Sequence, residues 1–127
     1  MTIGCVSCGP VTISDSVAGH WVLIGDGPVP LRSWWATPPV SKHEIDTFLL
    51  RKRAVIVLPE VFGVNAWLRS ITDRLAAHGI PALAIPLFAR TAPDLDLGYA
   101  DQDLQEGRRH KDATTAAQIL ADVSAAI

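Results

Sequence analysis

The clearest pattern of hydrophobic and polar positions runs over residues 54–86. It begins with AVIVL at residues 54–58, a continuous and mostly β-branched run that is typical of a strand buried on both faces of a parallel sheet. Pro59 ends that strand, and residues 80–85 form a second apolar run that is closed by Pro86. Because a helical pattern separates the two runs, this stretch predicts a βαβ unit with a right-handed crossover.

The helix between the two strands has recognisable signals at both ends. Asn65 is a favoured N-cap residue, because its side-chain oxygen can accept a hydrogen bond from the first turn. Gly79 follows His78 where the helix should stop, since glycine adopts the left-handed conformation easily. Arg69 and Asp73 are expected to form an exposed i,i+4 ion pair that stabilises the helix only weakly. One helical face is expected to contain Trp67, Leu68, Ile71 and Leu75.

The first third of the chain shows a weaker, β-rich pattern. Residues 1–10 are expected to form a flexible tail, and residues 11–37 to supply antiparallel strands, including VTIS and a strand pair around a turn at Gly25–Pro28. Polar residues 41–53 predict a connecting loop with at most a short helical turn. The tryptophans are expected to pack within the strands rather than to form a ligand cage, since neighbouring strand residues point to opposite faces; they are Trp21, Trp34 and Trp35.

Beyond Pro86 the pattern turns polar and then becomes helical again. A stretch rich in Asp and turn residues predicts an irregular excursion that continues to about residue 111. From about Asp112 a second helix is expected to continue to the end. Its apolar stripe is formed by Ala116, Leu120, Val123 and Ile127.

Composition and charge limit the possible classes. The chain has 127 residues, of which 49% are hydrophobic and 19% charged, so one globular domain is expected. A net charge of −2 and a longest basic run of only three residues disfavour nucleic acid as a partner. No apolar run approaches the ~18 residues of a membrane span. The N-terminus lacks the basic and apolar regions of a secretory signal, so a cytoplasmic protein without a membrane partner is expected.

Cys5 and Cys8 are the two cysteines of the chain. A structural zinc site requires four ligands, usually from a second Cys pair or a His pair, and the sequence has neither. We therefore expect no specific role for these thiols, with a redox or partial metal-binding role as the alternative. Neither a metal nor another cofactor is predicted for the chain.

Glu60 is the sharpest candidate for chemistry. It follows the predicted parallel strand at its carboxyl end, where open α/β sheets place their ligands. Desolvation beside Pro59 and Phe62 would favour its neutral form and general acid–base work. The alternative is a carboxylate that only caps the loop before the helix. The backbone N–H of Val61 faces the same region and could donate to a developing oxyanion.

These residues carry a family resemblance. EVFGVN at residues 60–65, LAAHG at 75–79 and PLFAR at 86–90 together resemble the dienelactone hydrolase family, and the tail LQEGRRHKDATTAAQILADVSAAI resembles the family helix before the nucleophile strand. The resemblance covers residues 54–127, with a weaker fit over 11–39. It implies an α/β fold: part of an α/β-hydrolase domain over residues 11–127, with antiparallel N-terminal strands, the βαβ unit and a further helix, ending before the nucleophile strand.

The resemblance also implies hydrolysis of a small ester or lactone of the carboxymethylenebutenolidase type, by a cysteine nucleophile with a His and an Asp. Glu60 would contact the resting thiol, Val61 would donate to the oxyanion and Phe62 would line the substrate site. Basic residues would bind the carboxylate of an acidic substrate; the candidates are Arg90, Arg108 and Arg109, each with a solvated surface as the alternative. One departure is Leu87, which stands where the family has an acidic residue.

A larger departure is that no G-x-C-x-G or G-x-S-x-G nucleophile motif occurs in the chain. Its four histidines all precede the position of the family's catalytic His. His78 is interpreted as a cation at a helix C-terminus, His110 as a surface residue and His20 as a strand flank, while His43 has no assigned role. The chain is therefore predicted to be inactive alone.

Without the nucleophile strand, the strand at residues 54–58 would have an open edge. We therefore expect self-association or pairing with a complementing C-terminal fragment. One alternative function is a non-catalytic binding module that uses this edge and the Glu60 loop. Another is a flavodoxin-like nucleotide-binding domain, which is disfavoured because PEVFGVN contains only one glycine.

Overall fold

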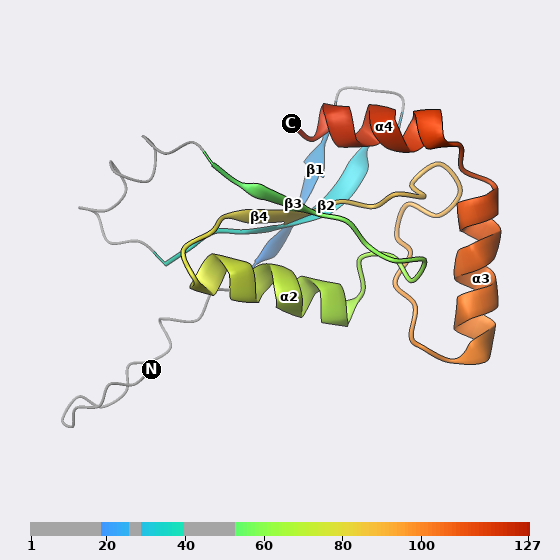
Figure 1. The fold of residues 1–127 in the computed structure, drawn as a ribbon, viewed down its shortest axis with the longest axis horizontal. Coiled ribbons are helices and arrows are strands. Elements are labelled where there is room, and N and C mark those ends of the chain that lie inside the picture. Colours follow the sequence, from blue (N-terminus) through green and yellow to red (C-terminus); the bar gives the residue numbers. More distant parts are fainter. Residues whose placement is uncertain (1–18, 26–28, 40–52) are drawn as a thin grey trace.

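A computed structural model describes residues 19–25, 29–39 and 53–127. Its strands are β1 (His20–Ile24), β2 (Leu31–Ala36), β3 (Val55–Val57) and β4 (Ala82–Ala84), and its helices are α2 (Ala66–Ala77), α3 (Asp101–Asp112) and α4 (Ala116–Ala125). Helix α2 lies on one side of the sheet, α4 lies on the other, and α3 stands at one end (Figure 1). The predictions for the N-terminal tail with Cys5 and Cys8, for VTIS, and for the loop with His43 lie outside the described residues.

The four strands form one mixed sheet in the order β1-β2-β4-β3. Strands β1 and β2 pair antiparallel, as predicted, with His20 opposite Trp35. Strand β4 runs antiparallel to β2 and parallel to β3, where Val55 lies opposite Ala82. All three residues of β4 are buried because strands flank it on both sides and α2 packs against it. The predicted strand–helix–strand unit is therefore confirmed, and β4 is an interior strand of the sheet.

The expected burial of the strand at residues 54–58 is wrong. Val55 is 39% exposed and Leu58 50% exposed, and the other residues of β3 are only partly buried. The reason is its position: β3 pairs with β4 alone, and no other described strand lies beside it. An apolar run typical of an interior strand therefore lies at an edge of the described sheet. This agrees with the separate prediction that the strand would have an open edge without the nucleophile strand.

Helix α2 begins and ends as its local sequence predicts. The Asn65 side chain accepts a hydrogen bond from the Leu68 N–H at 3.0 Å. At the other end Gly79 has a φ of +90°, and the Ile80 N–H donates to the Leu75 carbonyl at 3.0 Å. This arrangement satisfies the last carbonyls of the helix.

The buried face of α2 differs slightly from the prediction. Leu68, Thr72 and Ala76 are its buried residues. Their i,i+4,i+8 spacing forms one stripe against β2 and β4, whereas Trp67 lies about 100° around the helix and is 54% exposed. Leu68 therefore lies on the buried face of α2, and the prediction that Trp67 shares this face is wrong.

The core lies between α2 and the sheet. Its buried residues are Val64, Leu68 and Ala84, against which Trp21, Trp34 and Val57 pack. The rings of Trp21 and Trp34 meet edge to face with their centroids 5.2 Å apart, a favourable aromatic geometry. Packing within the strands, rather than a ligand cage, is confirmed for these two tryptophans.

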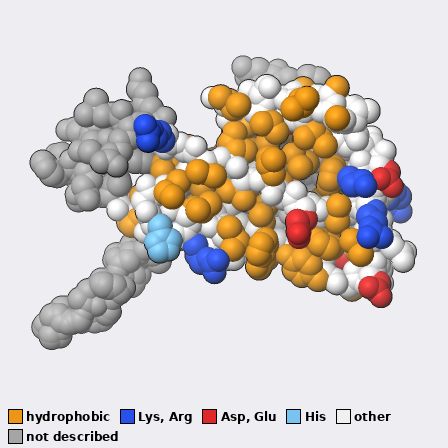
Figure 2. Space-filling view, viewed as in Figure 1, with side chains coloured by type: hydrophobic (Ala, Val, Ile, Leu, Met, Phe, Trp, Pro, Cys, Tyr) orange, Lys and Arg blue, Asp and Glu red, His pale blue; other side chains and the backbone are white. Residues whose placement is uncertain are grey.

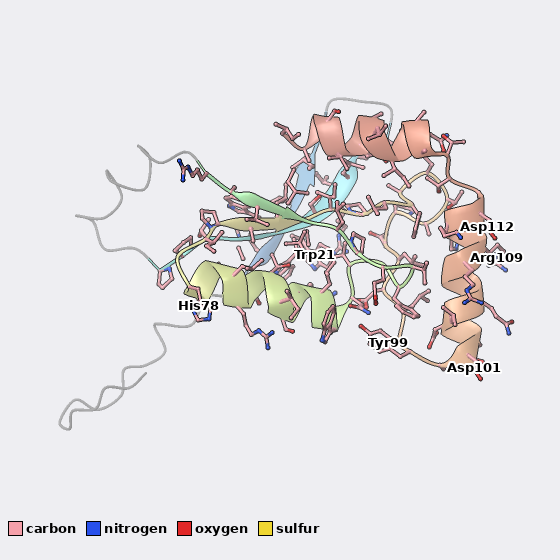
Figure 3. All side chains as sticks on the ribbon, viewed as in Figure 1. Trp21, His78, Tyr99, Asp101, Arg109 and Asp112 are labelled. Carbon is pink, nitrogen blue, oxygen red and sulfur yellow. The ribbon has the colours of Figure 1, made fainter. Side chains whose placement is uncertain are left out.

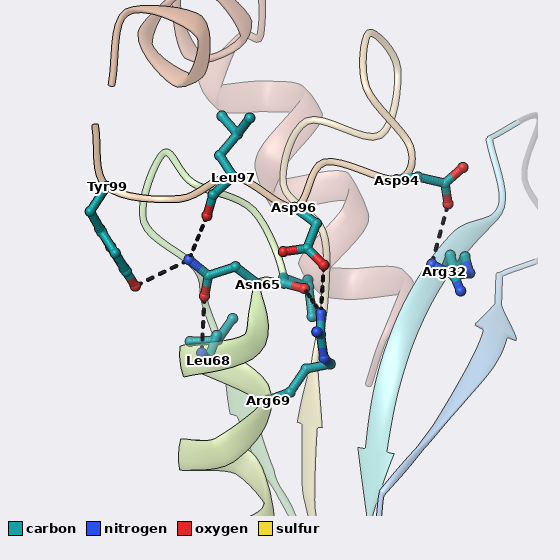
Figure 4. Close-up of polar contacts among 9 residues, drawn as sticks. Arg32, Asn65, Leu68, Arg69, Asp94, Asp96, Leu97 and Tyr99 are labelled. Atoms are coloured by element: carbon teal, nitrogen blue, oxygen red, sulfur yellow. Dashed lines mark hydrogen bonds and ion pairs between the residues drawn. The ribbon is translucent and has the colours of Figure 1, made fainter. Parts of the chain in front are cut away.

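Arg69 and Asp73 do not form the predicted pair, because each has a tertiary partner. Asp73 accepts hydrogen bonds from the Trp34 indole N–H at 2.7 Å and from the Gly19 N–H at 3.2 Å. Arg69 donates to the Val64 carbonyl at 2.7 Å and pairs with Asp96 at 2.9 Å (Figure 4). Both side chains therefore tie α2 to distant parts of the chain.

The C-terminal third holds two helices where one was predicted. Helix α3 occupies the segment expected to be irregular, and the predicted helix is the separate α4. Thr115 caps α4 by accepting from the Gln118 N–H at 3.2 Å. The apolar stripe predicted for α4 does not pack: Leu120 is 67% and Ile127 94% exposed. Asp122 is the buried residue of α4 instead.

We predict that Asp73→Ala lowers the free energy of unfolding by about 1–3 kcal/mol, because it leaves the Trp34 indole N–H without its acceptor. Urea unfolding followed by tryptophan fluorescence measures the change. Asp112→Ala is the control, since the Asp112 side chain is 72% exposed. Equal unfolding midpoints for the two variants would show that the hydrogen bond from Trp34 to Asp73 does not stabilise the fold.

Candidate functional site

Residues 59–65 form the loop that leaves the carboxyl end of β3. Pro59 is buried, but Glu60 is exposed, so the described residues do not desolvate its carboxylate as expected. Val61 and Phe62 are partly buried, and residues 63–65 are buried beneath them. The loop is therefore well packed at residues 63–65, and the Glu60 carboxylate is exposed to solvent.

A small cleft of about 10 Å³ lies beside this loop, which is room for a single water molecule. Phe62 and Tyr99 meet there edge to face, with ring centroids 4.7 Å apart, and Tyr99 projects from the segment before α3 (Figure 3). The structure thus brings Glu60 and Phe62 together, beside a tyrosine that sequence reasoning missed. The lining residues are Glu60, Phe62, Gly63, Asn65, Trp67, Leu68 and Tyr99.

Backbone contacts to residues 95–99 hold one side of the loop. Gly63 has a φ of +80°, and a Cβ there would lie 2.1 Å from the Leu95 carbonyl oxygen, so only glycine fits. The Phe62 carbonyl accepts from the Leu97 N–H at 2.9 Å. The Asn65 side-chain amide donates to the Leu97 carbonyl and to the Tyr99 hydroxyl, both at 3.1 Å (Figure 4). Asn65 therefore caps α2 and anchors the neighbouring segment.

The peptide between Glu60 and Val61 has a defined direction. The Glu60 carbonyl faces the Gly63 N–H at 3.4 Å. In a trans peptide the N–H points opposite to the carbonyl, so the Val61 N–H points away from Gly63. No described residue accepts a hydrogen bond from it. This N–H can donate to a group that enters the site.

Arg90 lies away from the Glu60 cleft. Its guanidinium pairs with Asp122 of α4 at 2.6 Å, and the Asp122 side chain is only 7% exposed. The two residues line a separate cavity of about 160 Å³ between α4 and the β1–β2 turn region. Arg108 is exposed on α3, and Arg109 pairs with Glu106 one turn earlier. None of these three arginines lines the cleft beside Glu60.

A hydrogen-bonded chain of three side chains ties α3 to the turn after β4. His110 is bonded through Nε2 to Glu106 at 2.8 Å and through Nδ1 to the Thr91 hydroxyl at 2.9 Å. The bond from His110 is the main reason that the pKa of Glu106 lies below its ordinary value, and Arg109 adds to the effect. The expectation of a surface histidine is wrong, since the His110 side chain is 14% exposed. The Glu–His spacing of four on a helix was the available sequence signal.

In the described part of the chain, no group of three or more His, Cys, Asp or Glu side chains could hold a metal ion. None of its helices combines the length and the apolar character needed to cross a membrane. The roles of Cys5 and Cys8 stay predictions.

Comparison with known proteins adds independent findings. The sequence model of the Dienelactone hydrolase family matches residues 43–127. A Synechocystis protein named "Putative carboxymethylenebutenolidase" is 42% identical over 105 residues, which cover 78% of this chain and 43% of the relative.

Solved structures show the same fold. A crystal structure named as that of a "Putative Dienelactone Hydrolase" from Klebsiella pneumoniae superposes with a TM-score of 0.64 at 24% identity, over 87% of this chain and 42% of the neighbour. The structure named m3DLH gives 0.54 at 22% identity, over 77% and 35%. The chain thus has part of an α/β-hydrolase fold, and it spans less than half the length of these relatives.

We predict that the Glu106–His110 bond contributes stability that acid removes. Because the folded pKa of Glu106 is lowered, this stability is present above the usual value of 4.5 and is lost as the pH falls through the lowered value. Wild type should therefore be more stable than Glu106→Gln at neutral pH, and the difference should shrink in acid. Urea midpoints measured between about pH 7 and pH 3 test this. A difference that stays constant over that range would contradict it.

Proposed function

The chain belongs to the dienelactone hydrolase family, and we propose that it supplies the Glu60 side of a site that hydrolyses a small ester or lactone. The matched part of the chain covers less than half of each relative, so the nucleophile is proposed to come from outside residues 1–127. The cytoplasmic location predicted from the sequence belongs to the same proposal, since a thiol nucleophile is kept reduced there.

Each residue has a role in the proposed reaction. The cysteine thiolate attacks the carbonyl carbon, and the carbonyl oxygen becomes an oxyanion that accepts from the Val61 N–H. The C–O bond then breaks, and the departing alkoxide takes a proton from the His–Asp pair. Water hydrolyses the thioester and regenerates the thiol. Glu60 contacts the resting thiol, and Phe62 contacts the substrate.

One observation carries this proposal. An exposed carboxylate and a backbone N–H without a partner among the described residues are adjacent, at the carboxyl end of β3. Ligands bind at this end of the strands in open α/β sheets. Arg108, exposed on α3, is proposed to contact the carboxylate of an acidic substrate. Arg90 is a weaker candidate because Asp122 already pairs with it.

The alternative function is a non-catalytic binding module that uses the β3 edge. The Val55 N–H and the Val57 carbonyl bond toward β4, so the Ile56 backbone groups between them point to the open edge. Hydrophobic side chains also gather on one face over α4 and the sheet near β3 (Figure 2). A strand from a complementing fragment or from a second copy of this chain would satisfy that edge.

The hydrolase proposal predicts two results. The 127-residue chain alone should hydrolyse 4-nitrophenyl acetate only at the background rate, because it lacks a nucleophile motif. A chimera that joins this chain to the remainder of the Synechocystis relative should be active. In the chimera, Glu60→Gln should lower kcat/KM by about 100-fold, whereas Asp112→Ala should leave it unchanged. Glu60-dependent turnover by the chain alone would refute the proposal, as would a chimera indifferent to Glu60.

The edge proposal predicts that the isolated chain associates. Light scattering after size-exclusion chromatography should give a mass above the 13.6 kDa of one chain. Ile56→Pro removes the outward N–H without removing a bond to β4, so it should shift the distribution toward monomer. Ile56→Val keeps that N–H and is the matched control. A monodisperse wild-type monomer that melts cooperatively would show that the edge needs no partner.

A further inference from the structure

We propose that α3 is the brace that holds the Val61 peptide in position to act as an oxyanion donor. Gly107 makes the contact, and the Glu106–His110–Thr91 chain attaches the helix to the turn after β4. The inference rests on the function proposed above, and it makes Gly107, His110 and Thr91 positioning residues rather than catalytic ones.

The contact at Gly107 is one of backbone against backbone. Gly107 is the buried residue of α3, and a Cβ there would lie 2.2 Å from the Val61 carbonyl oxygen and 2.9 Å from its carbon. No side chain can occupy such a space without displacing the peptide. Glycine in a helix interior is otherwise unfavourable, because it leaves the backbone flexible. Its presence here is explained by the close approach to Val61.

This contact closes the second side of the loop. Residues 95–97 hold the other side through the Leu95–Gly63 approach and the hydrogen bond from the Leu97 N–H to the Phe62 carbonyl. The Val61 carbonyl belongs to the peptide after Val61 and the Val61 N–H to the peptide before it. Gly107 of α3 therefore fixes the first peptide directly, and the second is held between this fixed carbonyl and the contact of the Glu60 carbonyl with the Gly63 N–H at 3.4 Å.

The attachment of α3 is polar and partly shielded. The His110 ring, 14% exposed, joins Glu106 on its own helix to Thr91 in the turn after β4. A neutral ring donates to Glu106 and accepts from the Thr91 hydroxyl, whereas a charged ring donates to both. Either protonation state keeps both bonds, and Arg109 is the other charged group that faces Glu106. The attachment is thus built to fix the position of α3 rather than to switch it.

The sequence allows the Val61 amide to be observed alone. The chain has three glutamates, and the residues that directly follow them are Ile45, Val61 and Gly107. Glu60–Val61 is therefore its single Glu-Val pair. Labelling with ¹³C-carbonyl glutamate and ¹⁵N-valine therefore gives one cross-peak in an HNCO spectrum of the 127-residue chain. That cross-peak reports the peptide that carries the proposed oxyanion donor.

Three variants and one control test the brace. Gly107→Ala should shift the Val61 cross-peak by pushing on its carbonyl. Thr91→Val removes the hydroxyl that anchors His110 and should also shift it, whereas Thr91→Ser restores the hydroxyl and should return it to the wild-type position. Lys111→Ala, on the exposed side of α3, should leave it in place, because the Lys111 side chain is 54% exposed.

An unmoved Val61 cross-peak in a folded Gly107→Ala chain would overturn the inference. If that variant fails to fold, the Thr91→Val and Thr91→Ser pair decides: equal spectra for these two would overturn it, and different Val61 positions would support it. These spectra need no substrate and no nucleophile. An inactive chimera would therefore count against the hydrolase proposal alone, and an unmoved Val61 cross-peak against the brace alone.

Discussion

Two close backbone approaches constrain the loop after β3, and the candidate site depends on them. Gly63 lies against the Leu95 carbonyl and Gly107 against the Val61 carbonyl, at separations that leave no room for a side chain. The loop is thus held by main chain on both sides, while Glu60 stays exposed. Backbone contacts are short and stiff, so they suit a site in which an N–H must point in one direction.

The rest of the fold brings these contacts about. Strand β4 is buried at the centre of the sheet, and the turn that follows it holds both C-terminal helices through polar side chains. Thr91 bonds to His110 of α3, and Arg90 pairs with Asp122 of α4. Strand β3 lies at the edge with its outer groups unpaired among the described residues. One side of the site is therefore well supported, and the described residues leave the side beside β3 open.

Local patterns predicted the strand–helix–strand unit well, because Pro59, Asn65 and Gly79 act on their immediate neighbours. Helix α3 was missed because DQDLQEGRRHKD has a single apolar residue and an interior glycine, so it shows no stripe of apolar residues at helical spacing. Its remaining signal was charge, acidic at the start and basic at the end. The Arg69–Asp73 prediction was wrong because a helix-surface rule takes no account of tertiary partners. Glu60 and Phe62 do meet in one cleft, but nothing local indicated that Arg90 would face Asp122 instead.

A crystal structure of the chimera after reaction with an alkyl phosphonate would show directly whether the Val61 N–H binds the oxyanion. The phosphonyl oxygen copies the oxyanion of the tetrahedral intermediate. We predict that this oxygen lies about 2.7–3.1 Å from the Val61 nitrogen, with α3 still packed against the Val61 carbonyl. A phosphonyl oxygen that is held by other donors, while the Val61 N–H points elsewhere, would contradict it.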